Sequence, residues 1–185
     1  MLRLFRLFSP AALSCLFVLS SCRTGSHVEE EAMLHNHSTR KGPGEPVSVK
    51  TPDRIRLYEF HGHLGPYVVL GFRASKLARE KLQSPGYFDL AAQVICPTSP
   101  PPSCFIDGVQ VGSGCTLGKG NLHVRAGEPV SCTFTRKNGR SVKITLRKEV
   151  PAKIKQWIKE FGVEGAGEKA WNAPEDELFE VKSGA

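Results

Sequence analysis

The chain has six cysteines, but no two of them stand in a CxxC spacing. The arrangement that typifies zinc fingers and thioredoxin-like redox motifs is therefore missing. Aromatic residues make up only 8% of the sequence, and they do not alternate with basic residues as they do on nucleic-acid-binding surfaces. We therefore interpret the formal net charge of +7 as a solvated basic surface and expect no nucleic-acid partner.

Recognisable catalytic and phosphate-binding motifs are also missing. The sequence has no Ser/His/Asp arrangement and no paired carboxylates that would by themselves identify a hydrolase. The run GSGCTLGKGN at 112–121 differs from a P-loop, because Ser113 replaces its first glycine and Gly120 replaces the serine or threonine after Lys119. A glycine-rich turn of this kind can still bind an anion through its backbone N–H groups.

The first 22 residues have the features of a secretory signal. Arg3 and Arg6 precede an apolar stretch at 11–19, which is too short for a transmembrane helix. The sequence LSSC, ending at Cys22, resembles a bacterial lipobox, which implies cleavage before this cysteine and lipid attachment to its thiol. We expect a lipoprotein anchored at a membrane of the cell envelope, facing the periplasm or the cell exterior, and Arg23 favours the outer membrane. Secretion with another cleavage site and an uncleaved anchor are the alternatives.

Residues 23–50 are polar, contain Gly and Pro and have few apolar side chains, so we interpret them as a flexible tether. A His-x-His pair, His35 and His37, lies in this tether, where no core is expected to hold it, and we treat it as adventitious. The folded domain is predicted at 51–161. Residues 162–185 contain several glycines and acidic residues and are expected to form a loosely packed tail, with Trp171 and Phe179 as its docking residues.

The stretch FHGHLGPYVVLGFRASKLAREKL at 60–82 is the part around which we expect the domain to be organised. Pro66 suits the first turn of a helix, and apolar residues then recur at intervals of three and four. His61 and His63 are placed in the turn before this helix, near its positive dipole end, where the field favours a neutral, metal-binding imidazole. Histidines in a turn with Gly and Pro are also common without any ligand, and that alternative stays open.

The remaining segments predict a mixture of helices and strands. Helices are expected at 51–59, with Thr51 as the cap, and at 104–115, although Gly108 and Gly112 weaken the second prediction. Strands are expected at 89–97, 122–125, 131–136 and 141–147, and a further helix at 151–161. The predicted fold class is α+β, a single domain in which helices pack on a small, mostly antiparallel sheet.

Three stretches together resemble the formylmethanofuran dehydrogenase E-subunit family. They are HGHLGP with the following GFRA, the run CFIDGVQVGSGCTLGKGN at 104–121, and a later strand that contains TF, and the resemblance spans Tyr58 to Leu146. It implies an α+β core, often as a homodimer, and in some members a metal, usually zinc, near the histidine turn. One departure concerns that turn. The family usually has HGHxCPG, whereas Gly65 and Tyr67 occupy the positions of the cysteine and of the glycine after the proline.

The resemblance also identifies candidate site residues. His61 and His63 match the paired histidines. A zinc site can be assembled from two or three of these and of Cys104, Asp107 and Cys115, together with water, because zinc accepts N, S and O donors in a tetrahedral array. The other motif residues are Asp107, Gln110, Thr116, Lys119 and Asn121. Beside such a site, Lys119 would lower a thiol pKa or hold an anionic ligand. Asp107 and Gln110 are alternatively a helix cap and a solvent-facing polar residue.

The cysteines allow a second interpretation. An exported protein folds in an oxidising compartment, so Cys96, Cys104, Cys115 and Cys132 are also candidates for two disulfides. A disulfide between Cys104 and Cys115 would exclude a thiolate metal site and leave a site based on histidine. If it stays free, Cys115 is expected in an exposed and reactive position.

Three functions remain in competition. We favour a metal- or small-ligand-binding module on a lipid anchor, without methanogenic activity. The second is an enzyme, either redox-active through Cys104 and Cys115 or hydrolytic through a metal-bound water, with one of the two histidines as ligand and the other as base. The third is a scaffold that kept the fold and lost the site, with Gly65 as the trace of that loss.

Overall fold

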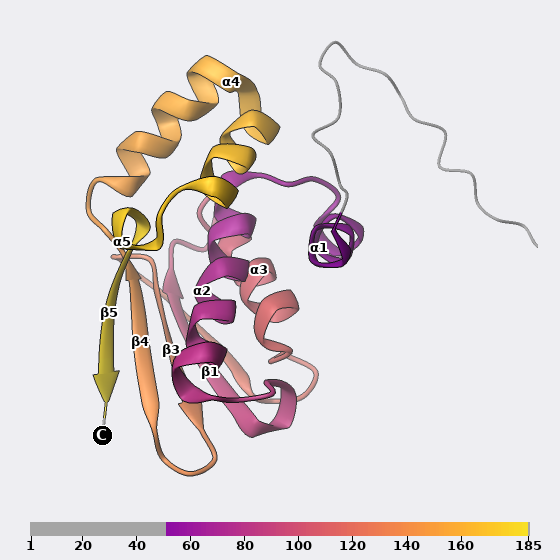
Figure 1. Ribbon diagram of the computed structural model, residues 1–185, viewed down its shortest axis with the longest axis vertical. Helices are drawn as coiled ribbons and strands as arrows, with labels where there is room; N and C mark the ends of the chain where they lie inside the picture. Colours follow the sequence, from indigo (N-terminus) through magenta and orange to yellow (C-terminus); the bar gives the residue numbers. More distant parts are fainter. Residues whose placement is uncertain (1–50, 185) are drawn as a thin grey trace, which may run out of the picture. The chain divides into compact units, whose positions relative to one another are not determined.

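The structure, a computed structural model, describes residues 51–184, which contain five α-helices and a five-stranded sheet (Figure 1). The elements are α1 (Pro52–His61), α2 (Pro66–Leu82), the 3₁₀ helix η1 (Tyr87–Asp89), β1 (Leu90–Cys96), α3 (Cys104–Ser113), β2 (Leu122–Ala126), β3 (Ser131–Arg136), β4 (Ser141–Leu146), α4 (Val150–Asn172), α5 (Glu175–Leu178) and β5 (Phe179–Gly184). Within this range no helix has the length and apolar character needed to cross a bilayer. The predicted signal peptide with Cys22, the tether and the His35/His37 pair lie outside the described residues.

The sheet has the strand order β2-β1-β3-β4-β5. The pairing of β1 with β2 is parallel, and the other three pairings are antiparallel. Parallel neighbours need a crossover connection, and α3 provides it between β1 and β2. The predicted α+β class, with a single domain and a mostly antiparallel sheet, is confirmed.

One face of the sheet carries the core, and the other face is open. Along β1 the side chains of Leu90, Ala92, Val94 and Cys96 are buried, whereas those between them are exposed or half-buried. This alternation is what a strand with one covered face requires. The helices α2 and α3 contact the strands from the covered side, as Figure 1 shows.

The helices α2 and α3 lie so close together that glycine is required where they meet. A Cβ atom at Gly71 of α2 would overlap the carbonyl oxygen of Phe105, and a Cβ at Gly108 of α3 would overlap that of Val68. The helix predicted at 104–115 is present as α3, although its glycines weakened the prediction. Their cost in helix propensity is offset by the close backbone approach that they allow.

The region after residue 161 differs from the expected loose tail. The helix α4 continues to Asn172, with a break at Gly162 (φ 71, ψ 178), and β5 adds a fifth strand beside β4. The interpretation of 162–184 as loosely packed is therefore wrong. Trp171 and Phe179 do dock, since Phe179 is 2% exposed and Trp171 stacks on Phe72 with ring centroids 5.5 Å apart. Apolar residues are sparse in this segment, and their burial depends on partners far away in the sequence.

Candidate functional site

The two histidines lie at the junction of α1 and α2. His61 is the last residue of α1, whose N-terminus is capped as predicted by Thr51. Gly62 ends the helix in the left-handed conformation (φ 86), and its N–H donates to the carbonyl oxygen of Tyr58 at 2.7 Å. The prediction that both histidines precede the positive end of one helix thus needs a correction, because His61 belongs to the carboxyl-terminal end of the preceding helix.

The imidazole of His61 is paired with the carboxylate of Asp107. The Nδ1 atom of His61 lies 2.7 Å from Oδ2 of Asp107, which is in the first turn of α3. Because an ionised carboxylate can only accept a hydrogen bond, Nδ1 carries the hydrogen, and the lone pair of the neutral ring is then on Nε2. This Nε2 atom is buried and has no hydrogen-bond partner among the described residues, while the whole side chain is 10% exposed.

His63 lies against His61. Their ring centroids are 4.7 Å apart, with an interplanar angle of 35°. Partial burial lowers the pKa of His63 below its ordinary value, and the neighbouring His61 lowers it further, although Glu164 opposes the shift. His63 is therefore neutral at neutral pH, which is the form of histidine that binds metals.

Cys104 belongs to the same end of α3 as Asp107. It is half-buried at the start of the helix, one turn before Asp107. Burial raises the pKa of its thiol, and the nearby carboxylate raises it further, so that Cys104 is protonated at neutral pH. Gln110 lies one turn beyond Asp107, where its carbonyl oxygen accepts from the N–H of Gly114. Among residues 51–184, no three His, Cys, Asp or Glu side chains gather closely enough to hold a metal ion.

Cys115 lies beyond the other end of α3 and does not join the histidines. Eight residues separate it from Asp107, and a helix of that length spans about 12 Å. The distance from Cys104 is longer still, whereas a disulfide needs Cα atoms within about 7 Å. All four cysteines of the described region are free. The expectation that Cys115 is exposed is wrong, because it is fully buried, and this burial raises its thiol pKa more than Lys119 lowers it.

The glycine-rich turn uses its polar groups internally. The side chain of Asn121 accepts from the N–H of Thr116 at 3.0 Å and donates to the carbonyl oxygens of Tyr87 and Leu90 at 2.8 and 2.9 Å. The Nζ atom of Lys119 donates to the carbonyl oxygen of Gly114 at 3.1 Å, and its N–H to Thr116. These bonds take up donors that an anion would need, so the arrangement does not favour an anion site.

The second half of α4, which sequence reasoning missed, supports the histidine turn. A Cβ atom at Gly167 would overlap the carbonyl oxygen of Leu64, the residue after His63. Arg54 of α1 forms a two-pronged ion pair with Glu168, at 2.6 and 3.1 Å, and its guanidinium lies 4.6 Å from the ring centroid of Trp171. The closely spaced small residues of GAG at 165–167 were a signal for helix packing in the sequence.

A shallow groove of about 650 Å³ lies away from the histidines, between the C-terminal part of α2, α5 and β5. Its lining contains no histidine or cysteine. The lining residues are Leu77, Lys81, Arg147, Glu175, Asp176, Phe179, Glu180, Val181 and Ser183. Oppositely charged side chains line it, and within the described range its carboxylates do not gather closely enough to hold a metal ion. The histidine turn is therefore the better candidate for a site.

Comparisons with known proteins agree with the motif resemblance. A family model described as "FmdE, Molybdenum formylmethanofuran dehydrogenase operon" matches residues 60–180. The solved structure of an FmdE-like protein of tungsten formylmethanofuran dehydrogenase, from Syntrophus aciditrophicus, is similar, with a TM-score of 0.52 and 26% sequence identity over 70% of this chain and 68% of that one. A probable S-adenosyl-L-methionine-binding protein from Archaeoglobus fulgidus is 38% identical over 112 residues, 56% of this chain. The chain spans only 29% of the length of that relative.

Proposed function

The chain belongs to the FmdE family, and we propose that its folded part is a metal-binding module in which His61 and His63 are ligands of a zinc ion. The module would hold a small ligand on that ion, without methanogenic activity. The proposal goes beyond the family assignment, and it is supported by the local geometry of the histidine turn.

The observation that carries the proposal is the unpartnered Nε2 atom of His61. Burial of a polar atom without a hydrogen bond costs free energy, so such an atom in a folded protein calls for an explanation. Metal-binding histidines typically donate their other ring N–H to a carboxylate, which fixes the ring and makes the free nitrogen a better ligand. The pair of His61 with Asp107 has this arrangement, and His63 supplies a second neutral imidazole beside it.

The two histidines suit zinc, but they provide only part of its coordination sphere. Two imidazoles suit this ion, whereas a closed structural site has four protein ligands. Since the described residues supply no group of three, the remaining positions would be taken by solvent, by a bound ligand or by a side chain of a second copy. When bound, zinc would supply a Lewis acid that attracts an anionic or amine group. His61 and His63 would hold it, and Asp107 would orient His61.

The place of the missing family cysteine supports this open arrangement. A Cβ atom at Gly65 would lie 2.9 Å from Nε2 of His63, so a cysteine at this position has its thiol close to the histidines. Gly65 leaves that space without a donor. A binding module with exchangeable positions is thus better supported than a closed structural zinc site.

An enzyme is the second candidate, and the hydrogen-bonded pair of His61 and Asp107 also supports it. A carboxylate that orients an imidazole is also the arrangement of a general base, with Nε2 as the atom that takes the proton. In that case His61 would act without a metal. Retention of zinc distinguishes the two candidates, because a general base needs a free Nε2 atom.

Export, lipid attachment at Cys22 and a homodimer complete the proposal. Support for the anchor comes from the basic and apolar residues before LSSC. Support for a dimer comes from two apolar side chains that remain exposed beside the histidines, Phe60 at 55% and Val163 at 45%. Loss of labelled fatty acid in Cys22→Ser, and the mass of the purified chain in solution, test these two points.

The decisive experiment measures zinc bound by the full chain purified without chelator. We expect about one zinc ion per chain that resists mild dialysis, and a loss of this zinc in His61→Ala and His63→Ala. The matched controls are His123→Ala, on the exposed side of β2, and the double variant H35A/H37A, which removes the other His-x-His pair. Equal zinc in His61→Ala and in the unsubstituted chain, or zinc lost only in H35A/H37A, would overturn the proposal.

A further inference from the structure

The end of the domain at η1 and the glycine-rich turn exposes several large apolar side chains. Tyr87 is 49% exposed, Phe88 64% and Leu117 63%. They belong to one surface, because the Nζ atom of Lys119 lies 6.0 Å from the ring centroid of Tyr87 and 5.9 Å from that of Phe88. A single exposed apolar residue is ordinary, but a group of them at one tip indicates a surface that is covered by something else.

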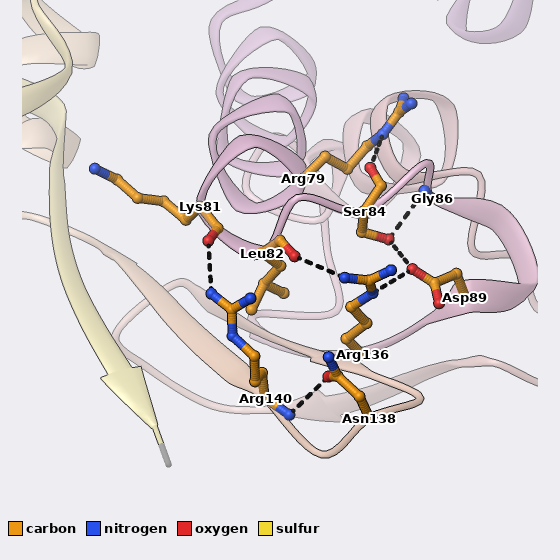
Figure 2. A network of polar contacts seen from close by, with 9 residues as sticks. All are labelled: Arg79, Lys81, Leu82, Ser84, Gly86, Asp89, Arg136, Asn138 and Arg140. Atoms are coloured by element: carbon orange, nitrogen blue, oxygen red, sulfur yellow. Dashed lines mark hydrogen bonds and ion pairs between the residues drawn. The ribbon is translucent and has the colours of Figure 1, made fainter.

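The side chains around this group are basic and largely unpaired. Lys137 lies next to η1, because its backbone N–H donates to the carbonyl oxygen of Asp89. The guanidinium of Arg140 donates to the carbonyl oxygen of Lys81, near the end of α2. Figure 2 shows that the one acidic side chain in this network, Asp89, is held by Ser84 at 2.6 Å and Arg136 at 2.8 Å. Within the described range, Lys119, Lys137 and Arg140 make no ion pair.

The backbone holds this tip in a fixed form. Tyr87 has a positive φ of 56°, which is uncommon for a residue with a large side chain. Asn121 holds it there by donating to its carbonyl oxygen, and a Cβ at Gly114 would lie 2.6 Å from its ring. The apolar side chains are thus exposed by a rigid local structure.

We propose that this tip, formed by Tyr87, Phe88, Leu117, Lys119, Lys137 and Arg140, docks on a bilayer that contains anionic phospholipid. Aromatic and aliphatic side chains enter the interface between headgroups and acyl chains, and lysine and arginine contact the phosphates. A bilayer fits better than a protein partner because the cations surround the apolar group without an acidic residue left to pair. The contact does not depend on the zinc site. It adds a second membrane contact to the lipid expected at Cys22 and would orient the domain on the bilayer.

The test places a tryptophan at the tip of the full chain. We expect the fluorescence of the Phe88→Trp variant to be quenched by brominated lipid in vesicles of phosphatidylcholine and phosphatidylglycerol in equal parts. The unsubstituted chain gives the background from Trp157 and Trp171. All variants share residues 1–50, so any contribution of the N-terminal segment is the same in each. The matched control is Phe161→Trp, at a similarly exposed apolar residue outside the tip, which should stay unquenched.

The basic residues are tested in the same assay. Neutralisation of three cations, K119Q/K137Q/R140Q in the Phe88→Trp background, should raise the anionic lipid needed for half-maximal quenching by about 100-fold, at about fivefold for each residue. Quenching that is absent, equal in vesicles of phosphatidylcholine alone, or equal in Phe161→Trp would overturn the proposal. A blue shift of the Phe88→Trp emission that depends on protein concentration and needs no vesicles would also overturn it, because a second copy would then cover the tip.

Discussion

The two sequence motifs of the domain behave differently in the structure. In the glycine-rich turn, Asn121 makes three hydrogen bonds and Lys119 donates to Gly114. In the histidine turn, Nε2 of His61 is buried and has no partner within residues 51–184. A polar group that the fold satisfies has a structural role, whereas one that the fold leaves unsatisfied is a candidate for ligand binding. On this basis the first motif maintains the fold and the second forms the site.

The most direct test of this difference substitutes Asp107, the partner of His61 in the histidine turn, and Asn121 of the glycine-rich turn. Asp107→Asn should lower zinc affinity about 10- to 100-fold, because a neutral amide replaces the charged carboxylate that accepts from Nδ1 of His61. Asn121→Ala should leave zinc affinity unchanged and lower the free energy of unfolding by about 2–3 kcal/mol, because three hydrogen bonds are lost. Zinc competition with a chromogenic chelator and urea denaturation measure the two effects. The distinction fails if both variants change the same quantity.

The support of the histidine turn by α4 gives a second test. Gly167→Ala should lower the free energy of unfolding by about 1–3 kcal/mol, because the added Cβ overlaps the carbonyl oxygen of Leu64 and the helix must move. This shift should also weaken zinc binding, since Leu64 follows His63. Gly118→Ala is the control from the other motif, because nothing lies within 4 Å of its Cβ. Equal stability of the two variants in thermal denaturation would contradict the packing of α4 against the turn.

Adding a third protein ligand should strengthen the site. Gly65→Cys adds a thiol beside Nε2 of His63, where the family usually has its cysteine, and should tighten zinc binding and slow zinc release. Gly65→Ala fills the same space without a donor, and its Cβ at 2.9 Å from Nε2 requires a small shift of the His63 ring. We expect weaker zinc binding in Gly65→Ala than in the unsubstituted chain. A Gly65→Cys variant that behaves like Gly65→Ala would show that position 65 does not face the metal.

The smallest expected effect is a pH dependence of stability that is specific to the histidine turn. The pKa of His63 is lowered from 6.5, so the unfolded chain takes up this proton first, and the metal-free protein should lose stability as the pH falls below 6.5. Arg54 lowers the pKa of Glu168 from 4.5, and the stability that this pair adds is lost only at lower pH. In urea denaturation as a function of pH, His63→Gln should remove the first decrease and keep the second. Persistence of the first decrease would assign it to another group.

The local elements of this protein could be predicted from its sequence. Thr51 and Pro52 start α1, Pro66 starts α2, and the alternation along β1 produces one buried face, because caps and periodicity act within a few residues. The family could also be recognised at this level, since its motifs are continuous stretches of sequence.

Which motif residues meet depends instead on tertiary contacts. Asp107 lies 46 residues after His61, and the two come together because Gly71 and Gly108 let α2 and α3 approach at backbone distance. The helix α3 separates Cys115 from the histidines, and the segment 162–184 takes its place through contacts with distant partners such as Leu64 and β4. These features follow from contacts between segments far apart in the chain, which periodicity and capping do not specify.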